Sequence, residues 1–460
     1  MATRIGQAPA AFDPAAFETF RFLSREIDAS GRVTLTYGLD DAFTFVEEIE
    51  LPLASPLGLG EQERLQGLLS LLHWVAGVSY FKTAAPPLVS CESGLPSPAV
   101  ADLLEALYSE GLGEFAYTNA LPALPRPRFP RRAASPLSAP SPTARSAPPR
   151  RVLVPVGGGK DSVVAIEVVR RAAQELALFS LGDAAPIART TTVAELPWLM
   201  ARRRLDPRIG ELNRGGALNG HVPVTAIVAC VALLTAALHG FDSVAMANER
   251  SASSGNLHWD GIEVNHQFSK GLAAERLLRE ALAEIGGTPR IFSVLRPASE
   301  LAIARAFARL EPYHAAFTSC NASFRLDLSL RSSSWCCECP KCRFVFLALA
   351  PFTAPARLAE IFGRDLLAEE DQFEGFALLS ASGGHKPFEC VGEEEESLAA
   401  IRLLARDPRW ASHAVVRRLA VEVLAAHPAS AGDPDAVLAL GSDHFVPAAL
   451  LPHVRALLAA

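Results

Sequence analysis

The middle of this 460-residue chain alternates short apolar runs with longer segments that repeat hydrophobic residues at helical spacing. Strands that each lead into a helix are typical of a parallel sheet covered by helices on both faces. We therefore predict an α/β fold built on a doubly wound parallel sheet. The expected strands are 152–156, 177–181, 243–247 and 290–295, and the expected helices are 163–175, 222–239 and 268–285.

The flanking parts of the chain follow other patterns. Alternating hydrophobic and polar residues near the N-terminus predict antiparallel strands, and two segments with helical spacing follow them. The next tract is rich in Pro, Ala, Ser and Arg, a composition that buries little surface and predicts a linker. The expected units are a small α+β domain at 1–118, a linker at 119–150, the sheet domain at 151–352 and a mostly helical region at 353–460.

A glycine-rich loop follows the first predicted strand of the sheet domain. Three glycines allow a tight turn with inward-facing N–H groups, and the start of the next helix adds partial positive charge. The loop therefore predicts a phosphate-binding site, in which Lys160 meets a phosphate and Asp161 holds Mg²⁺. Its residues are Gly157, Gly158, Gly159, Lys160, Asp161 and Ser162.

The spacing within this loop separates it from two common phosphate-binding motifs. Neither the P-loop pattern nor the dinucleotide-binding fingerprint is present. The loop resembles S-G-G-x-D-S of the PP-loop ATP pyrophosphatases, with Gly157 where that pattern has its first serine. The resemblance implies a HUP-like sheet domain that binds ATP, cleaves it between the α- and β-phosphates and adenylates an oxygen of the substrate.

Five of the eight cysteines lie between residues 320 and 342. Cys336, Cys339 and Cys342 follow one another at intervals of three residues and are candidate metal ligands, with Cys320 as a candidate fourth. Cys337 is then the one cysteine of the cluster left outside the ligand set, and it is called the spare below. Four thiolates in a tetrahedral array suit structural Zn²⁺. An iron–sulfur cluster accepts the same ligands, and the remaining alternative is a set of free buried thiols.

Polar residues crowd the chain after the predicted strand 243–247. Ligand sites of α/β sheets form at the carboxyl ends of strands, so these residues are candidates for substrate binding. Glu249 is a candidate Mg²⁺ ligand or base, and Arg250 is a candidate clamp for an anion. Other candidates, here and elsewhere in the chain, are Asn219, His221, Asn248, Asn256, Asn265, His266 and Lys386.

Beyond the loop, the chain resembles one PP-loop family in particular, the ATP-dependent UDP-N-acetylmuramoyl-L-alanyl-L-glutamate epimerases of the MurL type. The resemblance rests on the loop together with LNGHVPVTAI, NERSAS followed by VNHQ, CPKCRFVF and KPFECVG. It implies that UDP-MurNAc-L-Ala-L-Glu is the substrate and that an acyl adenylate precedes formation of the D-glutamyl epimer. ATP and Mg²⁺ are the implied cofactors, AMP and pyrophosphate are the implied by-products, and peptidoglycan precursor synthesis is the implied pathway.

These inferences give a set of expected site residues. Catalytic roles go to Lys160, Asp161, Glu249, Arg250 and His266, and substrate contacts to Asn219, His221, Asn248, Arg250, Asn256, Asn265 and Lys386. The base that removes the α-proton stays open among His221, His266, Glu249, Lys386 and the cysteines outside the metal set.

Composition narrows the alternatives. A net charge of −7 gives no electrostatic reason to bind nucleic acid, and the longest apolar run, 226–238, is too short to cross a bilayer. The first residues lack a secretory signal, so we expect a cytoplasmic protein that binds neither nucleic acid nor membranes. The rival interpretation is a PP-loop enzyme that modifies nucleobases or tRNA, because the cysteine cluster suits that class as well.

Overall fold

The computed structural model describes residues 12–133, 148–286, 289–324, 331–332, 334–380 and 387–459. Its centre is a mixed nine-stranded sheet with the strand order β11-β8-β5-β6-β7-β3-β2-β1-β4. The strands are β1 (Thr19–Ile27), β2 (Arg32–Leu39), β3 (Phe43–Glu50), β4 (Leu88–Cys91), β5 (Arg151–Pro155), β6 (Glu175–Leu181), β7 (Trp198–Arg204), β8 (Ser243–Met246) and β11 (Arg290–Ser293). A separate hairpin consists of β9 (Leu257–Trp259) and β10 (Ile262–Val264).

The parallel half of the sheet confirms the predicted α/β class. Strands β5, β6, β7, β8 and β11 pair in parallel, and β5, β6, β8 and β11 are the four strands expected from the apolar runs. Helices cover both faces, because Val152 and Val154 of β5 point into one hydrophobic core and Leu153 points into the other. The helices of this half are α6 (Lys160–Arg170), α7 (Ala185–Ala194), α8 (Arg208–Arg214), α9 (Val224–Leu238) and α10 (Leu272–Glu284).

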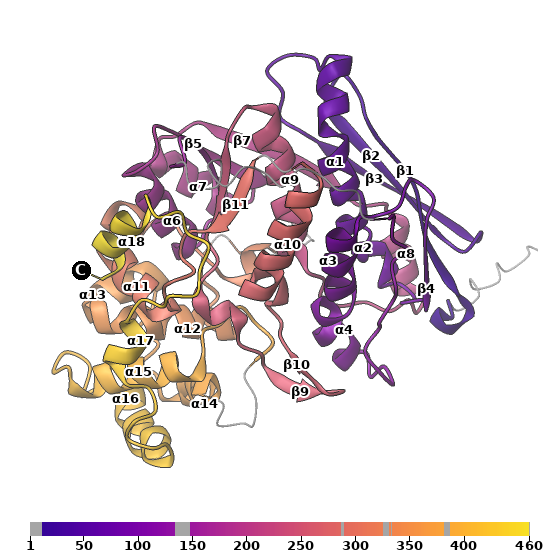
Figure 1. Cartoon of the computed structure of the whole chain (residues 1–460). Coiled ribbons are helices and arrows are strands. Elements are labelled where there is room, and N and C mark those ends of the chain that lie inside the picture. The colour runs from indigo at the N-terminus through magenta and orange to yellow at the C-terminus, as the bar shows by residue number, and fades with distance from the viewer. Residues whose placement is uncertain are drawn as a thin grey trace, which may run out of the picture.

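The N-terminal strands extend this sheet instead of forming one of their own. Strand β3 pairs in antiparallel fashion with β7, the last strand of the parallel half, which the sequence did not predict. The guanidinium of Arg203 donates to both carboxylate oxygens of the fully buried Glu47, at 2.7 and 3.0 Å. The N-terminal helices α1 (Leu59–Ala76), α2 (Val78–Phe81), α3 (Pro98–Tyr108) and α4 (Gly113–Thr118) lie beside these strands (Figure 1).

Two contacts between helices join the N-terminal part to the parallel half. Helix α1 packs on α9 and α3 packs on α10, so a single core serves both parts. Part of the tract predicted as a linker also packs here: Phe129 is 3% exposed, and Arg128 and Arg131 form ion pairs with Glu105 of α3. Residues 134–147 of that tract lie outside the described residues.

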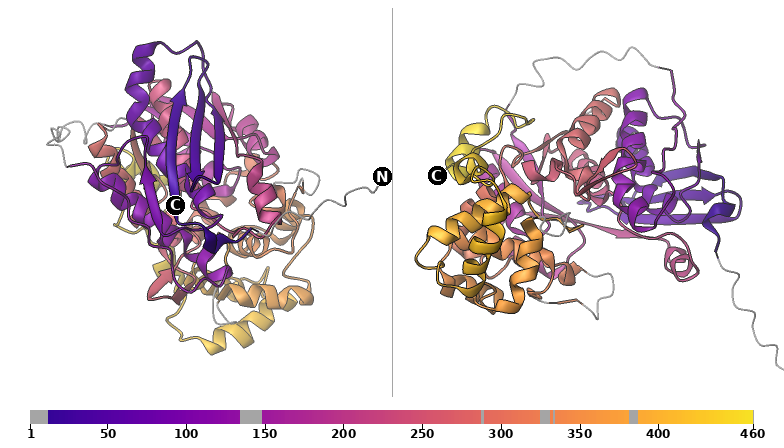
Figure 2. Two further views of the ribbon diagram at one scale, coloured as in Figure 1. Left: turned by 90° about the vertical axis from the view of Figure 1, so that its right-hand side faces the viewer. Right: turned by 90° about the horizontal axis from the view of Figure 1, so that it is seen from below.

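The C-terminal part is helical, as expected. It packs against the face of the parallel sheet that carries α6 and forms the end of the molecule opposite β1–β3 (Figure 2). Its helices are α11 (Glu300–Ala308), α12 (Pro340–Leu349), α13 (Pro355–Phe362), α14 (Phe373–Ala377), α15 (Glu394–Arg406), α16 (Ala414–Arg418), α17 (Pro434–Leu438) and α18 (Leu451–Leu458). Among the described residues, no helix is both long enough and apolar enough to span a bilayer.

Candidate active site

The strand order places one region of the sheet edge at the centre of the candidate site. Strand β5 has β6 and β7 on one side and the later strands β8 and β11 on the other, so the order in which strands are added to the sheet reverses at β5. In open α/β sheets, ligands bind at the carboxyl ends of the strands where this reversal occurs. The glycine-rich loop follows β5 at that point, and the polar run follows β8.

The geometry of the loop explains its glycines. Gly158 has a φ of 81°, and a Cβ there would lie 2.7 Å from the backbone carbon of Pro186. A Cβ on Gly159 would meet the hydroxyl of Ser319 at 2.6 Å. The N–H of Gly157 donates to Ser162 Oγ at 2.9 Å and closes the loop over the first turn of α6. Larger residues therefore cannot replace Gly158 or Gly159 without displacing their neighbours.

Three acidic side chains meet beside this loop and are called here the carboxylate cluster. Asp161, Glu249 and Glu300 each offer an oxygen within 4.8 Å of the others. Glu249 and Glu300 are 2% and 1% exposed, and Glu249 Oε1 has no hydrogen-bond partner among the described residues. A buried carboxylate oxygen without a partner is costly unless a cation binds it. Three carboxylate oxygens at this spacing suit Mg²⁺.

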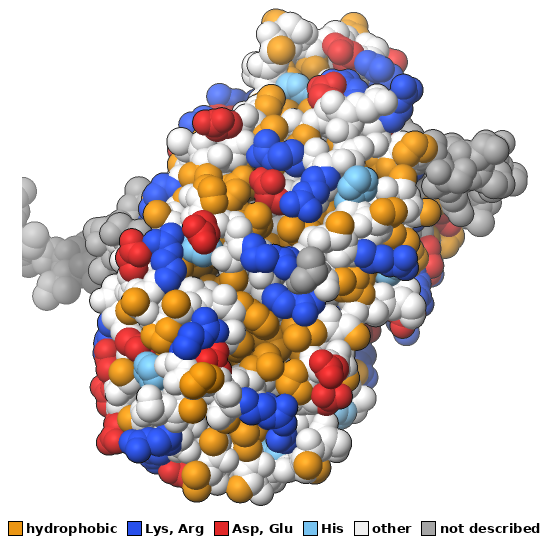
Figure 3. Space-filling model, turned by 90° about the vertical axis from the view of Figure 1, so that its left-hand side faces the viewer, with side chains coloured by type: hydrophobic (Ala, Val, Ile, Leu, Met, Phe, Trp, Pro, Cys, Tyr) orange, Lys and Arg blue, Asp and Glu red, His pale blue; other side chains and the backbone are white. Residues whose placement is uncertain are grey.

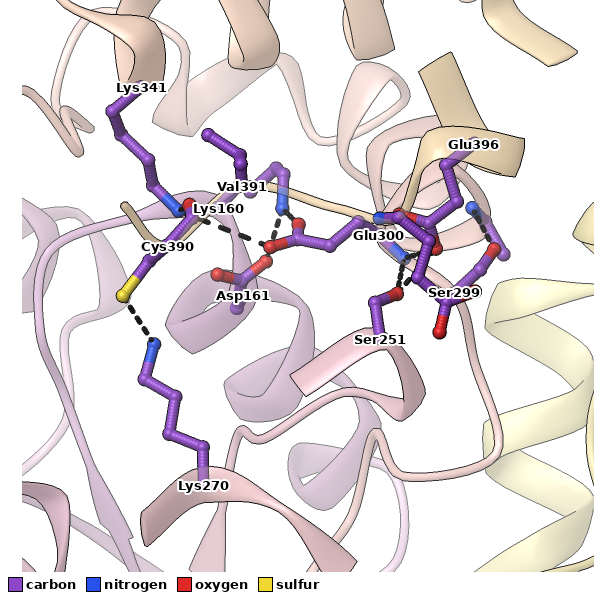
Figure 4. A network of polar contacts seen from close by, with 12 residues as sticks. Lys160, Asp161, Ser251, Lys270, Ser299, Glu300, Lys341, Cys390, Val391 and Glu396 are labelled. Carbon is purple, nitrogen blue, oxygen red and sulfur yellow. Dashed lines mark hydrogen bonds and ion pairs between the residues drawn. The ribbon is translucent and has the colours of Figure 1, made fainter. Parts of the chain in front are cut away.

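Two lysines offset part of the negative charge of the carboxylate cluster (Figure 4). The Nζ atom of the buried Lys160 lies 2.5 Å from Asp161 Oδ1 and also forms an ion pair with Glu300. Lys341 Nζ lies 4.0 Å from Glu300 Oε1. Burial alone would lower the pKa of Lys160, but the two carboxylates outweigh it and raise that pKa. Burial and the charge of Asp161 raise the pKa of Glu300.

Four helices begin at this cluster and deliver its charged side chains. Lys160 and Asp161 open α6, Glu300 opens α11 and Lys341 lies in the first turn of α12. Glu396 is in the first turn of α15, and its Oε1 accepts a hydrogen bond from the backbone N–H of Glu300 at 2.9 Å. Burial, together with the charge of Glu300, raises the pKa of Glu396 to about 8. The partial positive charges of four helix N-termini therefore converge on one point.

A second group of titratable side chains adjoins the carboxylate cluster. The rings of His221 and His266 lie 4.3 Å apart, and His266 Nδ1 contacts Glu114. Burial lowers the pKa of His221 to about 4, with a further contribution from His266. Burial would also lower the pKa of His266, but Cys390 and Glu114 raise it to about 9. At neutral pH, His266 is therefore a cation and a proton donor, whereas His221 is neutral.

Replacing Glu114 with glutamine is expected to lower the pKa of His266. A histidine whose pKa is raised on folding stabilises the folded state below its unfolded pKa, near 6.5, and this contribution is lost as the pH rises through about 9. Glu114→Gln should therefore cost on the order of 2 kcal/mol at pH 7 and much less at pH 9.5. Urea unfolding of both proteins at the two pH values measures the difference. An equal loss at both pH values would contradict the ion pair.

The other predicted site residues hold the surrounding loops together. Arg250 points away from the cluster, since its guanidinium donates to the carbonyls of Val437 and Ala439 in the C-terminal region. The asparagine side chains have internal partners: Asn219 accepts from Lys82, and Asn248, Asn256 and Asn265 donate to Ser293, Pro387 and Ala252. Lys386 lies outside the described residues.

The four predicted cysteine ligands come together at the start of α12. The sulfur atoms of Cys320, Cys336, Cys339 and Cys342 all lie within 4.8 Å of one another. The distance from Cys342 Sγ is 3.7 Å to Cys336 Sγ and 3.4 Å to Cys339 Sγ. Tetrahedral Zn–S bonds of about 2.3 Å require sulfurs about 3.8 Å apart. The spare, Cys337, is oriented differently, and its Sγ contacts the carbonyl of Phe362 at 3.4 Å.

Several residues of this site escaped the sequence analysis. Glu300 follows β11 just as Glu249 follows β8, so the same rule about strand ends could have found it. Cys390 was already a candidate base, as one of the cysteines outside the metal set, whereas Lys270 follows the run VNHQ and was not singled out. Lys341 lies within CPKCRFVF, which was singled out for its cysteines, and the sequence carries no comparable signal for Glu114 or Glu396.

Comparisons with known proteins identify relatives of this chain. Residues 11–294 match the family model described as MurL N-terminal domain, and residues 316–433 match the MurL C-terminal domain. Three relatives are each named UDP-N-acetyl-alpha-D-muramoyl-L-alanyl-L-glutamate epimerase. The Salinispora tropica relative is 47% identical, with 87% of this chain and 88% of the relative covered. The Micromonospora sp. relative is 46% identical, with 96% of this chain and 98% of the relative covered. The Xanthomonas oryzae pv. oryzae relative is 41% identical, with 97% of this chain and 99% of the relative covered.

Proposed function

Because the chain belongs to the MurL epimerase family, we propose that it converts UDP-N-acetylmuramoyl-L-alanyl-L-glutamate into the D-glutamyl epimer in peptidoglycan precursor synthesis. The reaction consumes ATP and releases AMP and pyrophosphate. The observation that carries the use of ATP is the loop of residues 157–162 beside the buried carboxylate cluster. A phosphate-binding loop and a cation site have no evident use in an epimerisation that does not activate its substrate.

The chemistry of the substrate explains why activation is needed. The α-proton of a glutamyl residue is next to a carboxylate, and its removal would place a second negative charge beside the first. Transfer of AMP to that carboxylate converts it into a mixed anhydride, whose carbonyl can take up the charge as an enolate. The α-carbon can then be reprotonated on the opposite face, and water releases AMP and the epimer.

The residues of the site have distinct roles in this proposal. Backbone N–H groups of the loop bind the β- and γ-phosphates at the start of α6. Asp161, Glu249 and Glu300 would hold Mg²⁺, which would supply positive charge to the triphosphate. Glu249 Oε1 has no hydrogen-bond partner among the described residues and therefore suits a metal ligand. Lys160 and Lys341 favour ionised carboxylates by their charge. Substrate and ATP are held together, so the attack on the α-phosphorus becomes intramolecular.

The cysteine site has a structural role in this proposal. The short distances between its sulfurs favour a single Zn²⁺ ion over an iron–sulfur cluster, which spaces its ligands more widely because they bind different irons. Zinc bound here would fix the loop before α12 and thereby the position of Lys341.

We also propose that the sheet domain is a doubly wound PP-loop domain, on the strength of its loop and its strand order. The rival activity on tRNA has less support. The face drawn in Figure 3 mixes basic, acidic and hydrophobic side chains, whereas RNA binding favours a continuous basic surface. The net charge of −7 is also unfavourable for RNA binding. We further propose that the protein is located in the cytoplasm.

The proposed reaction predicts a specific isotope pattern. Incubation with ATP, Mg²⁺ and the L-glutamyl substrate in D₂O should yield AMP, pyrophosphate and a D-glutamyl product that carries deuterium at the α-carbon. Chiral analysis of the released glutamate and mass spectrometry measure both outcomes. AMP without deuterium would indicate another acyl-adenylate reaction. A D-glutamyl product formed equally well without ATP would contradict the role of the loop.

A further inference from the structure

Cys390 lies between two lysines: its backbone carbonyl faces Lys341, which reaches the carboxylate cluster, and its sulfur faces Lys270 (Figure 4). Its Sγ accepts a hydrogen bond from Lys270 Nζ at 3.4 Å and interacts with His266. Its carbonyl oxygen accepts a hydrogen bond from Lys341 Nζ, the atom that lies 4.0 Å from Glu300 Oε1. A single lysine side chain therefore spans the distance between Cys390 and the cluster.

Side chains from separate loops fix the segment around Cys390. Asn256 Nδ2 donates to the carbonyl of Pro387 at 2.9 Å, and Gln267 Nε2 donates to the carbonyl of Val391 at 3.3 Å. The amide of Asn321 donates to the Glu389 carboxylate. These contacts hold the segment around Cys390 in place although no helix or strand contains it, and the residue as a whole is partly exposed.

The surroundings of Cys390 differ from those of the other cysteines. Four cysteines form the candidate metal site, while Cys91, Cys230 and Cys337 are buried and burial raises their pKa values. Burial would raise the pKa of Cys390 as well, but three cations face it: Lys270 from η4 (Phe268–Lys270), His266 from the preceding loop and Lys341 from α12. Together they lower its pKa to about 6.

On the basis of the proposed function, we infer that Cys390 is the base that removes the α-proton of the adenylated glutamyl residue. Lys270 and His266 act as positioning residues that hold the thiolate. The proton moves to sulfur, the C–H electron pair becomes the C=C bond of the enolate, and the carbonyl π electrons move to oxygen. The opposite face then takes a proton that exchanges with water, and the thiol returns its proton to solvent.

Four other titratable groups near the site are less suitable for this role. His266 and Lys270 carry protons at neutral pH, because the acidic groups around them raise their pKa values. Glu249 and Glu300 are buried in the candidate cation site. The Cys390 thiolate, in contrast, is unprotonated at neutral pH and adjoins the candidate cation site without being part of it. A base that acts on the adenylated substrate requires such a position.

Two substitutions test the role of the thiolate in D₂O. Cys390→Ala and the nearly isosteric Cys390→Ser should reduce deuterium incorporation and D-glutamyl product by on the order of 10³-fold. AMP formation should fall far less, since water still hydrolyses the adenylate. The matched control is Cys91→Ala, which changes a buried cysteine of β4 and should leave both rates near those of the unmodified chain.

The outcomes separate this inference from the function on which it rests. Absence of D-glutamyl product from the unmodified chain would overturn the function and the role of Cys390 together. Retained epimerisation in both Cys390 variants, or an equal loss of AMP and product, would overturn the role of Cys390 alone. A glutamyl thioester on Cys390 in acid-quenched protein would also overturn it, because the sulfur would then be a nucleophile.

Alkylation by iodoacetamide tests the thiolate without the reaction. The rate at Cys390, followed by peptide mass spectrometry, should reach half its maximum near pH 6. In Lys270→Met this midpoint should rise by at least about one pH unit, because the nearest cation is lost. A midpoint above pH 8 in the unmodified chain would overturn the inference.

Discussion

Asp161→Asn is expected to lower the rate of AMP formation by on the order of 10³-fold. The substitution keeps the size of the side chain and removes one of three charged oxygens from the carboxylate cluster. Two contributions add to the loss: weaker binding of Mg²⁺, and less positive charge near the triphosphate where negative charge builds up during transfer. The Mg²⁺ concentration for half-maximal rate should therefore rise together with the loss of rate.

The fold should tolerate this change, because Lys160 keeps its ion pair with Glu300. Asp41→Asn is the matched control, since the Asp41 side chain is 96% exposed between β2 and β3 and far along the sheet from β5. Release of pyrophosphate and AMP, thermal unfolding and a Mg²⁺ titration of each variant measure the three effects. A variant that forms AMP within tenfold of the unmodified chain would refute the assignment of the loop and cluster.

Cys342→Ser is expected to remove the bound metal and most of the activity. Serine is a poor zinc ligand, and the Cys342 side chain is fully buried in the core at the start of α12. Loss of a structural metal belongs to the most destabilising class of single changes, so the cost should be on the order of 4 kcal/mol. AMP formation should also fall, because the neighbouring Lys341 contacts both Glu300 and the carbonyl of Cys390.

Cys337→Ser serves as the control for this prediction. Cys337 is in the same turn, but its sulfur points to Phe362 and not to the other four. Elemental analysis should find about one zinc ion per chain in the unmodified protein and in Cys337→Ser, and much less in Cys342→Ser. Equal metal content in the two variants, or none in the unmodified chain, would rule out the proposed zinc site.

The periodicity of the sequence was enough to predict the parallel strands, with one exception. Strands β5, β6, β8 and β11 are short apolar runs because both of their faces are buried. Strand β7 begins with the short apolar run 198–201 but ends in three arginines, so neither a run nor an alternation extends over the whole strand. Its charges are explained only by the acidic strand that pairs with it, and that strand is more than a hundred residues away in the sequence.

The candidate site was predictable where a local motif carries the chemistry. The glycine-rich loop and the four cysteines have short, specific spacings, and the structure brings each set together. The partners of the loop residues come from distant segments, so no spacing could reveal that Lys341 or Glu396 meets Glu300. For Arg250, a local signal suggested a role that the contacts do not indicate. Its position after a strand suggested an anion clamp, but its guanidinium donates to backbone carbonyls of the C-terminal region.

The pairing of β3 with β7 has a consequence for synthesis on the ribosome. Strands β1–β3 emerge early, and the edge of β3 has no partner until the chain has grown past residue 204. Exposed strand edges invite association between nascent chains, and charged residues prevent it. Glu47, Glu48 and Glu50 supply such charges during this interval, and in the finished protein Arg203 and Arg204 pair with them. The same acidic residues thus protect the growing chain and later fix the register of the completed sheet.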